Sequence, residues 1–351
     1  PSGNERSLFD RLAGGYQRLV ALTLRLRWGV IGLAIALCAG ATWGIMNIGH
    51  ELFPKVDSGQ FMILARAQPG TPLAETEVLV EGVERQVMEK LGKPDPNETD
   101  ETSDLKLLIS NIGVLYDWPA GYTPNAGPMD AFLLVQLKDD RKQTAQQWAR
   151  ELRNHLAQTN PGVEFAFDTG GMMTAALNFG LPAPINIQVR GSKLDKLQEI
   201  ARGVVEQVKS VEGSVDVRIA EPTGHPAISI QVDRTKAAVL GLSQEDVIKN
   251  VATAINSSCN FAPAFWIDPR NGNHYLMGAQ YQEMDIQSLE TLDNIPITGP
   301  KSTSPTLLKN IATIVRTTTP VIVQHQNITR TVNIFADVDG RDVGSVGNEI
   351  L

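Results

Sequence analysis

The sequence predicts an α+β protein with one membrane-spanning helix near its N-terminus, and two observations carry this prediction. Residues 28–49 contain no ionisable side chain over 22 positions. At about 1.5 Å per residue, such a helix covers the roughly 30 Å hydrocarbon core of a bilayer. After it, strand and helix patterns follow one another in a βαββαβ order, and this order starts a second time. We therefore expect one membrane helix followed by two split βαβ units.

The membrane helix has a competing interpretation as a secretory signal peptide. The apolar region of a signal peptide is usually about 7 to 15 residues long and precedes a small-residue cleavage site. Here the apolar run is longer and continues into His50 and Glu51. Trp28 and Trp43 lie near its ends, where indole rings favour the membrane interface. These features favour a membrane helix at 28–49.

Charge predicts the orientation of this helix. Residues 1–27 hold five arginines against two acidic residues, a balance of +3, whereas the chain after the helix holds 26 basic and 37 acidic residues, a balance of −11. The positive-inside rule places 1–27 in the cytoplasm. Apolar residues recur there at helical spacing beside the arginines, which predicts an amphipathic helix on the inner leaflet of the lipid bilayer. The acidic remainder argues against nucleic acid as a partner.

The first βαββαβ unit is predicted between residues 50 and 170. Its elements are a strand (61–67), a helix (73–91), two strands (105–114 and 130–138), a helix (144–157) and a strand (163–167). Both helices carry an apolar stripe. In the first helix the stripe consists of Val78, Leu79, Val83, Val87 and Leu91, and in the second of Trp148, Leu152 and Leu156. This order predicts a ferredoxin-like sheet with helices on one face.

The second unit is interrupted. A strand (185–190), a helix (194–211) and further strands (215–220, 227–232 and 329–338) are predicted, and a last helix begins at Asp342. An insertion at 234–323 contains a helix over 242–255, with Ser243 as its N-cap. Because the last strand of the pattern is missing, we expect the chain to be a fragment that ends inside this unit. The two cysteines, Cys38 and Cys259, lie on and beyond the membrane helix and predict no intrachain disulfide.

Three stretches together resemble the resistance-nodulation-division (RND) efflux transporters: ELFPKVDSGQFMI (51–63), AQPGTP (67–72) and VDRTKAAVLGLSQEDV (232–247). The resemblance covers nearly the whole chain. It is to the start of the second half of such a transporter, namely its seventh membrane helix and second large periplasmic loop. In the multidrug branch, which we favour, the whole protein exports small amphiphilic molecules from the periplasm or outer leaflet.

The resemblance implies a domain assignment and a set of partners. Residues 50–170 would be one pore subdomain, 171–233 with 324–351 a second, incomplete one, and 234–323 a docking subdomain inserted into it. The transporter would be a proton-driven homotrimer of the bacterial inner membrane. It would work with a periplasmic adaptor, or membrane fusion protein, and an outer-membrane channel, and most of this chain would be periplasmic. Proton coupling in the family uses charged residues of membrane helices, and the helix at 28–49 has none.

Catalytic motifs are absent from the sequence. Its five histidines form no HExxH motif, and no CxxC, GxSxG or phosphate-binding glycine loop occurs. We therefore predict no enzyme activity, no catalytic or metal-binding residues and no cofactor. The acidic loop at 95–104 could bind a cation weakly, but it lacks the glycine and terminal glutamate of a calcium loop, so a solvated loop is favoured.

Substrate recognition is predicted in the loop 113–128, which holds Tyr116, Trp118 and Tyr122 among glycines and prolines. Such rings suit amphiphilic ligands because they offer contact area and a hydrogen-bonding edge. By the resemblance, this is the glycine-containing switch loop between two drug pockets. The alternative is that the rings pack the loop onto its sheet. On adjoining strands, Met62, Leu64 and Leu134 are further candidates, although an ordinary core role is favoured for these three.

Export of heavy-metal cations is the nearest alternative function. The copper and silver branch of the family uses three methionines in its cleft, because soft thioethers select Cu(I). The corresponding positions here are Leu64, Asp130 and Ala176, none of which is a soft ligand. Met172 and Met173 lie close to the third position. A more distant alternative is a single-pass, membrane-anchored periplasmic binding module, which would need a chain that completes its last domain.

Overall fold

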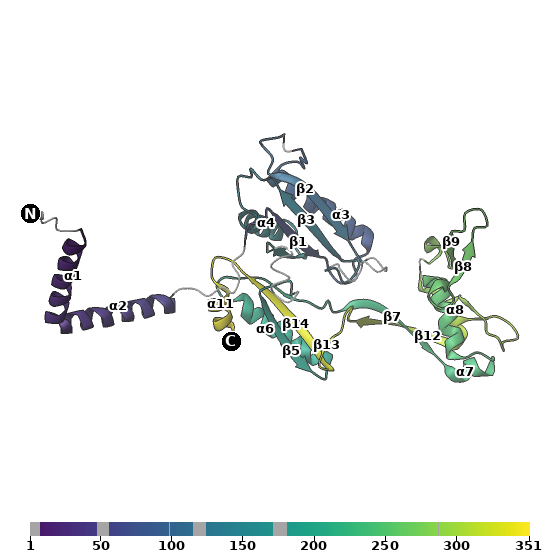
Figure 1. The fold of residues 1–351 in the computed structure, drawn as a ribbon. Coiled ribbons are helices and arrows are strands. Elements are labelled where there is room, and N and C mark those ends of the chain that lie inside the picture. Colours follow the sequence, from purple (N-terminus) through teal and green to yellow (C-terminus); the bar gives the residue numbers. More distant parts are fainter. Residues whose placement is uncertain (1–7, 48–55, 98, 115–123, 171–180, 287) are drawn as a thin grey trace, which may run out of the picture.

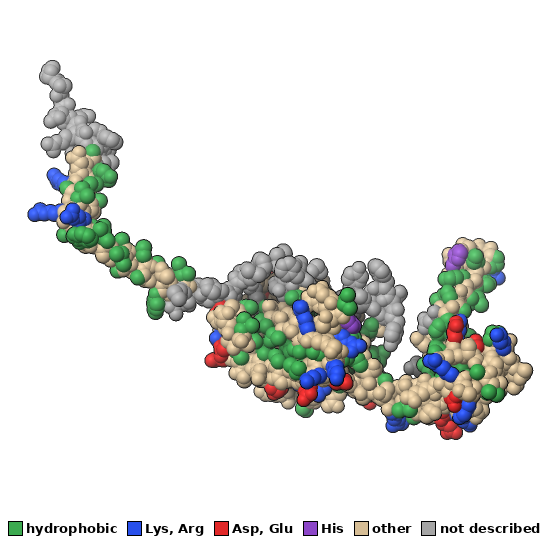
Figure 2. Space-filling view, turned by 90° about the horizontal axis from the view of Figure 1, so that it is seen from below, with side chains coloured by type: hydrophobic (Ala, Val, Ile, Leu, Met, Phe, Trp, Pro, Cys, Tyr) green, Lys and Arg blue, Asp and Glu red, His purple; other side chains and the backbone are tan. Residues whose placement is uncertain are grey.

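The computed structural model describes residues 8–47, 56–97, 99–114, 124–170, 181–286 and 288–351. At one end, helices α1 (Leu8–Arg25) and α2 (Arg27–Asn47) extend away from the sheets, and α1 is turned from the direction of α2 (Figure 1). Residues Arg27–Ile45 are long and apolar enough to cross a membrane, and the described chain buries none of this stretch. In Figure 2 this helix shows mostly hydrophobic side chains, and arginine side chains gather on α1.

The first unit is a four-stranded antiparallel sheet in the order β2-β3-β1-β4. Its elements are β1 (Gln60–Arg66), α3 (Leu73–Leu91), β2 (Leu105–Ile112), β3 (Asp130–Leu137), α4 (Ala145–Thr159) and β4 (Glu164–Asp168). Alternate residues of the central strands, such as Ile63 and Leu133, are fully buried against α3 and α4. Since strand side chains alternate between faces, both helices cover one face and leave the other open.

Helix α3 buries a face slightly different from the predicted one. Val78, which we placed in its apolar stripe, is 69% exposed, whereas Thr76 is buried. The buried stripe consists of Thr76, Val80, Val83, Val87 and Leu91. Burial of Thr76 is compensated because its hydroxyl donates a hydrogen bond to the Pro72 carbonyl (3.2 Å). The buried face of α3 therefore follows helical spacing from Val83, even where this spacing buries a polar threonine and exposes an apolar valine.

The second unit is a smaller sheet in which β14 pairs with β5 along one edge and with β13 and β6 along the other. Its elements are β5 (Ile185–Gly191), α6 (Leu194–Lys209), β6 (Ser214–Ile219), β13 (Gln324–Gln326), β14 (Thr329–Val338) and α11 (Val343–Ile350). Side chains of α6, including the fully buried Ala201, pack on Val332 and Ile334 of β14. Strands from both sides of the insertion therefore build one core.

One strand predicted for this sheet lies elsewhere. The prediction at 227–232 corresponds to β7 (His225–Val232), which pairs with β12 (Ala312–Thr319) in a two-stranded antiparallel ribbon of eight residue pairs. The periodicity of a strand does not identify its partner. Both edges of β14 are already occupied by β5 and β6, and β12 offers β7 an unbroken register. The ribbon joins the second unit to the insertion (Figure 1).

The insertion has its own small core, built around Val247, Ile297 and Leu308. Its helices and strands are α7 (Arg234–Val239), α8 (Gln244–Asn256), η2 (Ser258–Asn260), β8 (Ala264–Ile267), β9 (His274–Met277), η3 (Glu283–Asp285), α9 (Leu289–Asp293), β10 (Pro296–Ile297), β11 (Thr306–Leu307) and α10 (Leu308–Ile311). The predicted N-cap Ser243 forms a capping box with Asp246 at the start of α8. Assignment of this insertion as a docking subdomain, and of the two sheets as pore subdomains, stays a prediction.

The β8–β9 hairpin at the far end of the insertion exposes apolar side chains on both of its faces. Phe265 is 62% exposed, and the consecutive Trp266 is 50% exposed. Neighbouring residues of a strand point to opposite faces. On the partner strand Leu276 is 57% exposed, and the rings of Trp266 and Tyr275 lie 5.7 Å apart. The described chain therefore covers neither face of this hairpin.

Candidate substrate site

The uncovered face of the first sheet carries a band of apolar side chains, which we call the open face. It consists of Met62, Leu64, Leu107, Ile109, Phe132 and Leu134. Met62 lies opposite Leu134 in the β1–β3 register, and Leu64 lies opposite Phe132. The three predicted site residues that the structure describes, Met62, Leu64 and Leu134, are therefore brought together on one face. All three are half-buried, so they are not part of the closed core between the sheet and its helices.

Strand β2 adds two residues to the open face that the sequence analysis missed. Ile109 lies opposite Leu134 and is 47% exposed, and Leu107 is 37% exposed. The available signal was the run Leu107, Leu108 and Ile109 within β2, because consecutive apolar residues of a strand place apolar side chains on both of its faces. An antiparallel strand with a solvated face normally carries polar residues there, so two exposed aliphatic side chains mark a contact surface.

Three predicted site residues, Tyr116, Trp118 and Tyr122, lie outside the described residues. The base of their loop is described and is firmly held. Asn125 is buried, and its Nδ2 donates to the carbonyl of Gly113 (2.8 Å), across the loop. Gly113 has φ = +71°, and its N–H donates to the carbonyl of Asp130 (2.8 Å). Because Gly113 follows β2 and Asp130 begins β3, the loop starts and ends at one end of the open face.

At this end of the sheet, Asp130 of β3 forms an ion pair with Arg66 of β1. Nε of Arg66 lies 2.8 Å from Oδ1 of Asp130, whose side chain is only 5% exposed. The N–H of Ala126 donates to the other carboxylate oxygen (2.8 Å). These contacts satisfy and neutralise the carboxylate. The resemblance predicts that Asp130 stands at one of the three methionine positions of the copper and silver branch, and in the structure both of its carboxylate oxygens are engaged by Arg66 and the Ala126 N–H.

The other two metal positions add no ligand within the described residues. Leu64 has no donor atom, and Ala176 lies outside the described residues, as do Met172 and Met173. Among the described residues, no group of three or more His, Cys, Asp and Glu side chains could hold a metal ion. Met62 contributes one thioether to the open face, and its described cross-strand neighbours are Leu134 and Asp168.

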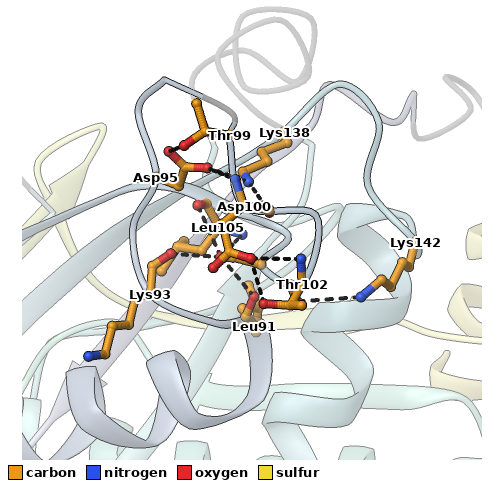
Figure 3. Close-up of polar contacts among 10 residues, drawn as sticks. Leu91, Lys93, Asp95, Thr99, Asp100, Thr102, Leu105, Lys138 and Lys142 are labelled. Carbon is orange, nitrogen blue, oxygen red and sulfur yellow. Dashed lines mark hydrogen bonds and ion pairs between the residues drawn. The ribbon is translucent and has the colours of Figure 1, made fainter.

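The acidic loop at 95–104 contains an internal cation, the ammonium group of Lys138 (Figure 3). Nζ of Lys138 lies 2.8 Å from Oδ2 of Asp95 and 2.7 Å from the carbonyl of Asp100. The hydrogen bond from Lys138 lowers the pKa of Asp95 to about 2. Thr102 hydrogen bonds likewise lower the pKa of Asp100. The loop is therefore organised around a lysine that directly follows β3.

Comparisons with known proteins agree with the resemblance found in the sequence. The model of the AcrB/AcrD/AcrF family matches residues 3–350. Protein HelA of Legionella pneumophila is 22% identical over 98% of this chain and 32% of its own length. Cobalt-zinc-cadmium resistance protein CzcA of Cupriavidus metallidurans (strain ATCC 43123 / DSM 2839 / NBRC 102507 / CH34) is 23% identical over 89% of this chain and 28% of its own length. Cation efflux system protein CusA of Escherichia coli (strain K12) is 22% identical over 93% of this chain and 29% of its own length.

Solved structures of a heavy metal efflux pump have the same fold. Its crystal form II matches with a TM-score of 0.78 and 19% identity, over 98% of this chain and 33% of that chain. Crystal form I matches with a TM-score of 0.76 and 20% identity, over 91% of this chain and 32% of that chain. The chain thus spans about a third of the length of the proteins that it matches.

Proposed function

Because the chain belongs to the AcrB/AcrD/AcrF family of resistance-nodulation-division transporters, we propose that it is part of an efflux transporter for amphiphilic small molecules. The observation that carries this proposal is the open face, where aliphatic, aromatic and thioether side chains stay accessible at the base of an aromatic loop. Such a surface offers apolar contact and few fixed polar groups. It therefore suits ligands that bind mainly by removing apolar area from water.

A second candidate cargo is a heavy-metal cation, and the names of the relatives favour it. CusA is named a cation efflux system protein and CzcA a cobalt-zinc-cadmium resistance protein, and the matching solved structures are of a heavy metal efflux pump. Against this, the described residues supply no cluster of metal ligands. Two of the three expected methionine positions are a leucine and an ion-paired aspartate. The residues thus support the organic cargo, whereas the relatives support the cation.

The assembly follows from the family and is part of the proposal. Residues 1–27 would lie in the cytoplasm, α2 would cross the inner membrane, and the sheets would lie in the periplasm. The β8–β9 hairpin exposes apolar side chains on two faces, which supports a docking role for the insertion in a homotrimer with an adaptor and an outer-membrane channel. Proton coupling would be performed by other membrane helices of the complete transporter.

The test uses the complete transporter in cells that lack their own pumps. Ile109→Glu places a charge on the open face, while Val78→Glu places one on the exposed outer side of α3 in the same unit. We expect Ile109→Glu to reduce export of apolar dyes at least about tenfold, which corresponds to about 1.4 kcal/mol of lost binding. Val78→Glu should leave export unchanged.

Metal resistance is measured in the same strains with copper, silver, zinc, cobalt and cadmium salts. If the organic cargo is correct, the wild-type transporter protects cells against dyes and drugs and not against these salts. Protection against a metal salt alone, unaffected by Ile109→Glu, would replace the first candidate with the second. Equal loss of dye export in both glutamate variants would remove the open face from the proposal.

A further inference from the structure

The first and second units meet along a seam made of polar contacts. Each unit has its own buried apolar cluster, and no cluster of the described residues includes members of both. Instead, side chains of α4 and β1 in the first unit reach β6 and the segment directly after β14 in the second. Arg66 also crosses the seam, since its Nη1 donates to the carbonyl of Ile219 (3.2 Å). Interfaces of this polar kind within a chain commonly permit relative movement of the parts.

Asp216 of β6 is the centre of the seam. Its side chain is 3% exposed and binds Arg153 of α4 in a two-pronged ion pair, with distances of 2.8 Å from Nε to Oδ1 and 3.0 Å from Nη2 to Oδ2. The backbone N–H of Phe167, on the edge strand β4, donates to the same carboxylate (2.8 Å). One carboxylate of the second unit is thus bound by two elements of the first.

The backbone at Asp216 is strained in a way that supports this role. Its φ of +53° lies in the left-handed region that side chains other than glycine seldom adopt. The β6–β14 register also shifts here, between Phe335 and Asp337. Such bulges re-aim a side chain, and residues in rare conformations persist only where their surroundings hold them. At this place the Asp216 carboxylate accepts hydrogen bonds from Arg153 and from the Phe167 N–H, both across the seam.

Arg153 stays charged in this environment. Burial acts to lower the pKa of its guanidinium group, but the hydrogen bonds and charge of Asp216, together with Asp337 and Asp339, raise it above its ordinary value. The group also lies 5.1 Å from the centre of the Phe167 ring. A second two-pronged pair, Arg150 with Asp339 at 2.7 and 2.5 Å, lies beside it and is more exposed.

From this geometry we infer that Arg153 and Asp216 are positioning residues that hold the two units in register, and that separating the units breaks this pair. Since no apolar cluster of the described residues spans the seam, separation would expose mainly polar groups there. A two-pronged buried pair fixes one arrangement, because an arginine fork matches a carboxylate in few orientations. Opening would also free Asp216 from the contacts that hold its strained backbone.

The seam is adjacent to the open face. Strand β4 provides Phe167 for the seam, and its Ala166 lies opposite Leu64 in the β1–β4 register. Separation of the units would therefore widen access to the open face from the β4 side. This last step rests on the proposed function. The inference that the Arg153–Asp216 pair holds the two units together does not rest on it.

The test measures the distance between the units in the complete transporter, reconstituted in lipid without cargo. Spin labels are placed at Glu89 on α3 and Gln207 on α6, both exposed, and labelled protein is diluted with unlabelled protein. Asp216→Asn keeps the shape and tolerates positive φ, but removes the charge. Arg85→Gln is the matched control, because it removes an exposed Arg–Glu pair within α3.

We expect a narrow distance distribution in the wild type and in Arg85→Gln. Asp216→Asn and Arg153→Gln should each shift it to longer distances, and the double variant should shift it no further than either single one. Arg153→Lys keeps the charge without the fork and should give an intermediate shift. Wild-type distributions in both Asp216→Asn and Arg153→Gln would overturn the inference.

Arg150→Gln is a further variant for the same distance measurement, and it should fold normally because the Arg150 side chain is 53% exposed. The variant should shift the distribution in the same direction by a smaller amount. The shift should grow when salt is raised from about 0.1 to 1 M, where the screening length falls from about 10 to 3 Å. If Asp216→Asn does not fold, an unchanged and salt-independent distribution in Arg150→Gln overturns the inference. Loss of dye export with unchanged distances would bear on the proposed cargo and not on the seam.

Discussion

Nζ of Lys138 lies 2.8 Å from Oδ2 of Asp95, and the two side chains are only 3% and 13% exposed. This pair connects the long loop after α3 to the end of β3, and the Asp100 carbonyl gives the same ammonium a second acceptor. Within the part of the chain that the structure describes, the ammonium group of Lys138, directly after β3, thus holds the loop in place. One of its acidic side chains, that of Asp95, thus belongs to an internal ion pair.

Replacing Lys138 with methionine should therefore destabilise the first unit at neutral pH. The pKa of Asp95 is lowered to about 2, first by the hydrogen bond from Lys138. A lowered folded-state pKa adds stability that is present above the unfolded value near 4 and is lost as pH falls through about 2. The difference in melting temperature between wild type and Lys138→Met should be largest near pH 7 and shrink as pH falls below 4.

Lys142→Met is the control for this prediction. It removes an exposed 3.4 Å hydrogen bond from Nζ to the Thr102 carbonyl and keeps the backbone N–H that donates to Asp104. It should melt near the wild-type temperature at every pH. A difference between wild type and Lys138→Met that stays constant from pH 7 to pH 2 would mean that the ion pair does not couple protonation of Asp95 to folding.

The aromatic loop gives a prediction about cargo. If Trp118 binds substrate, Trp118→Ala should weaken export of bulky aromatic compounds by about thirtyfold, because a buried aromatic anchor often contributes about 2 kcal/mol. Its melting temperature should change little, since a ring on a recognition loop leaves the sheet core intact. Tyr116→Ala should behave similarly. Large destabilisation with equal loss of every substrate would instead make these rings part of the packing of the loop.

Orientation in the membrane is tested by labelling single cysteines. In a complete transporter freed of its native cysteines, a cysteine at Ser210, which is exposed at the end of α6, should react with a membrane-impermeant thiol reagent in spheroplasts. A cysteine at Ser7, in the arginine-rich flank, should react only after the membrane is permeabilised. The opposite labelling pattern would reverse the orientation that the positive-inside rule predicts.

Removal of the insertion should leave the second sheet folded. Replacing residues 225–319 with a short linker removes the whole β7–β12 ribbon, whereas every described partner of β14 in the sheet, namely β5, β6 and β13, is retained. We expect a membrane-inserted protein that resists limited proteolysis in its sheets and fails to form a stable trimer. Rapid digestion of the second unit would show that the ribbon is required for its folding.

Local patterns in the sequence predicted most of the elements, and the reason is clear in α3 and α8. The helix predicted at 73–91 is Leu73–Leu91 in the structure, because its spacing and flanking residues act locally. Ser243 was predicted as the N-cap of α8, and its hydroxyl accepts a hydrogen bond from the Asp246 N–H (3.1 Å). Which face α3 buries was less local, since burial of Thr76 depends on the sheet beneath it.

Relationships between distant segments were not predictable in this way. The pairing of β7 with β12 joins strands that lie about eighty residues apart, and β7 alone looks like a member of the second sheet. The seam contact between Arg153 and Asp216 has no signal in the sequence, because each is one charged residue among many. Within the candidate site, Met62, Leu64 and Leu134 followed from period-two alternation, whereas the contribution of Ile109 depends on the register of β2.

The β7–β12 ribbon can act as a lever between the second sheet and the insertion. Eight residue pairs at about 3.4 Å per residue give it a length of about 25 Å. A rotation of roughly 10° at its base would displace its far end by about 4 Å, which is comparable to a strand spacing. A small change of angle in the sheet that borders the seam would thus displace the insertion, which carries the exposed hairpin, by several ångströms.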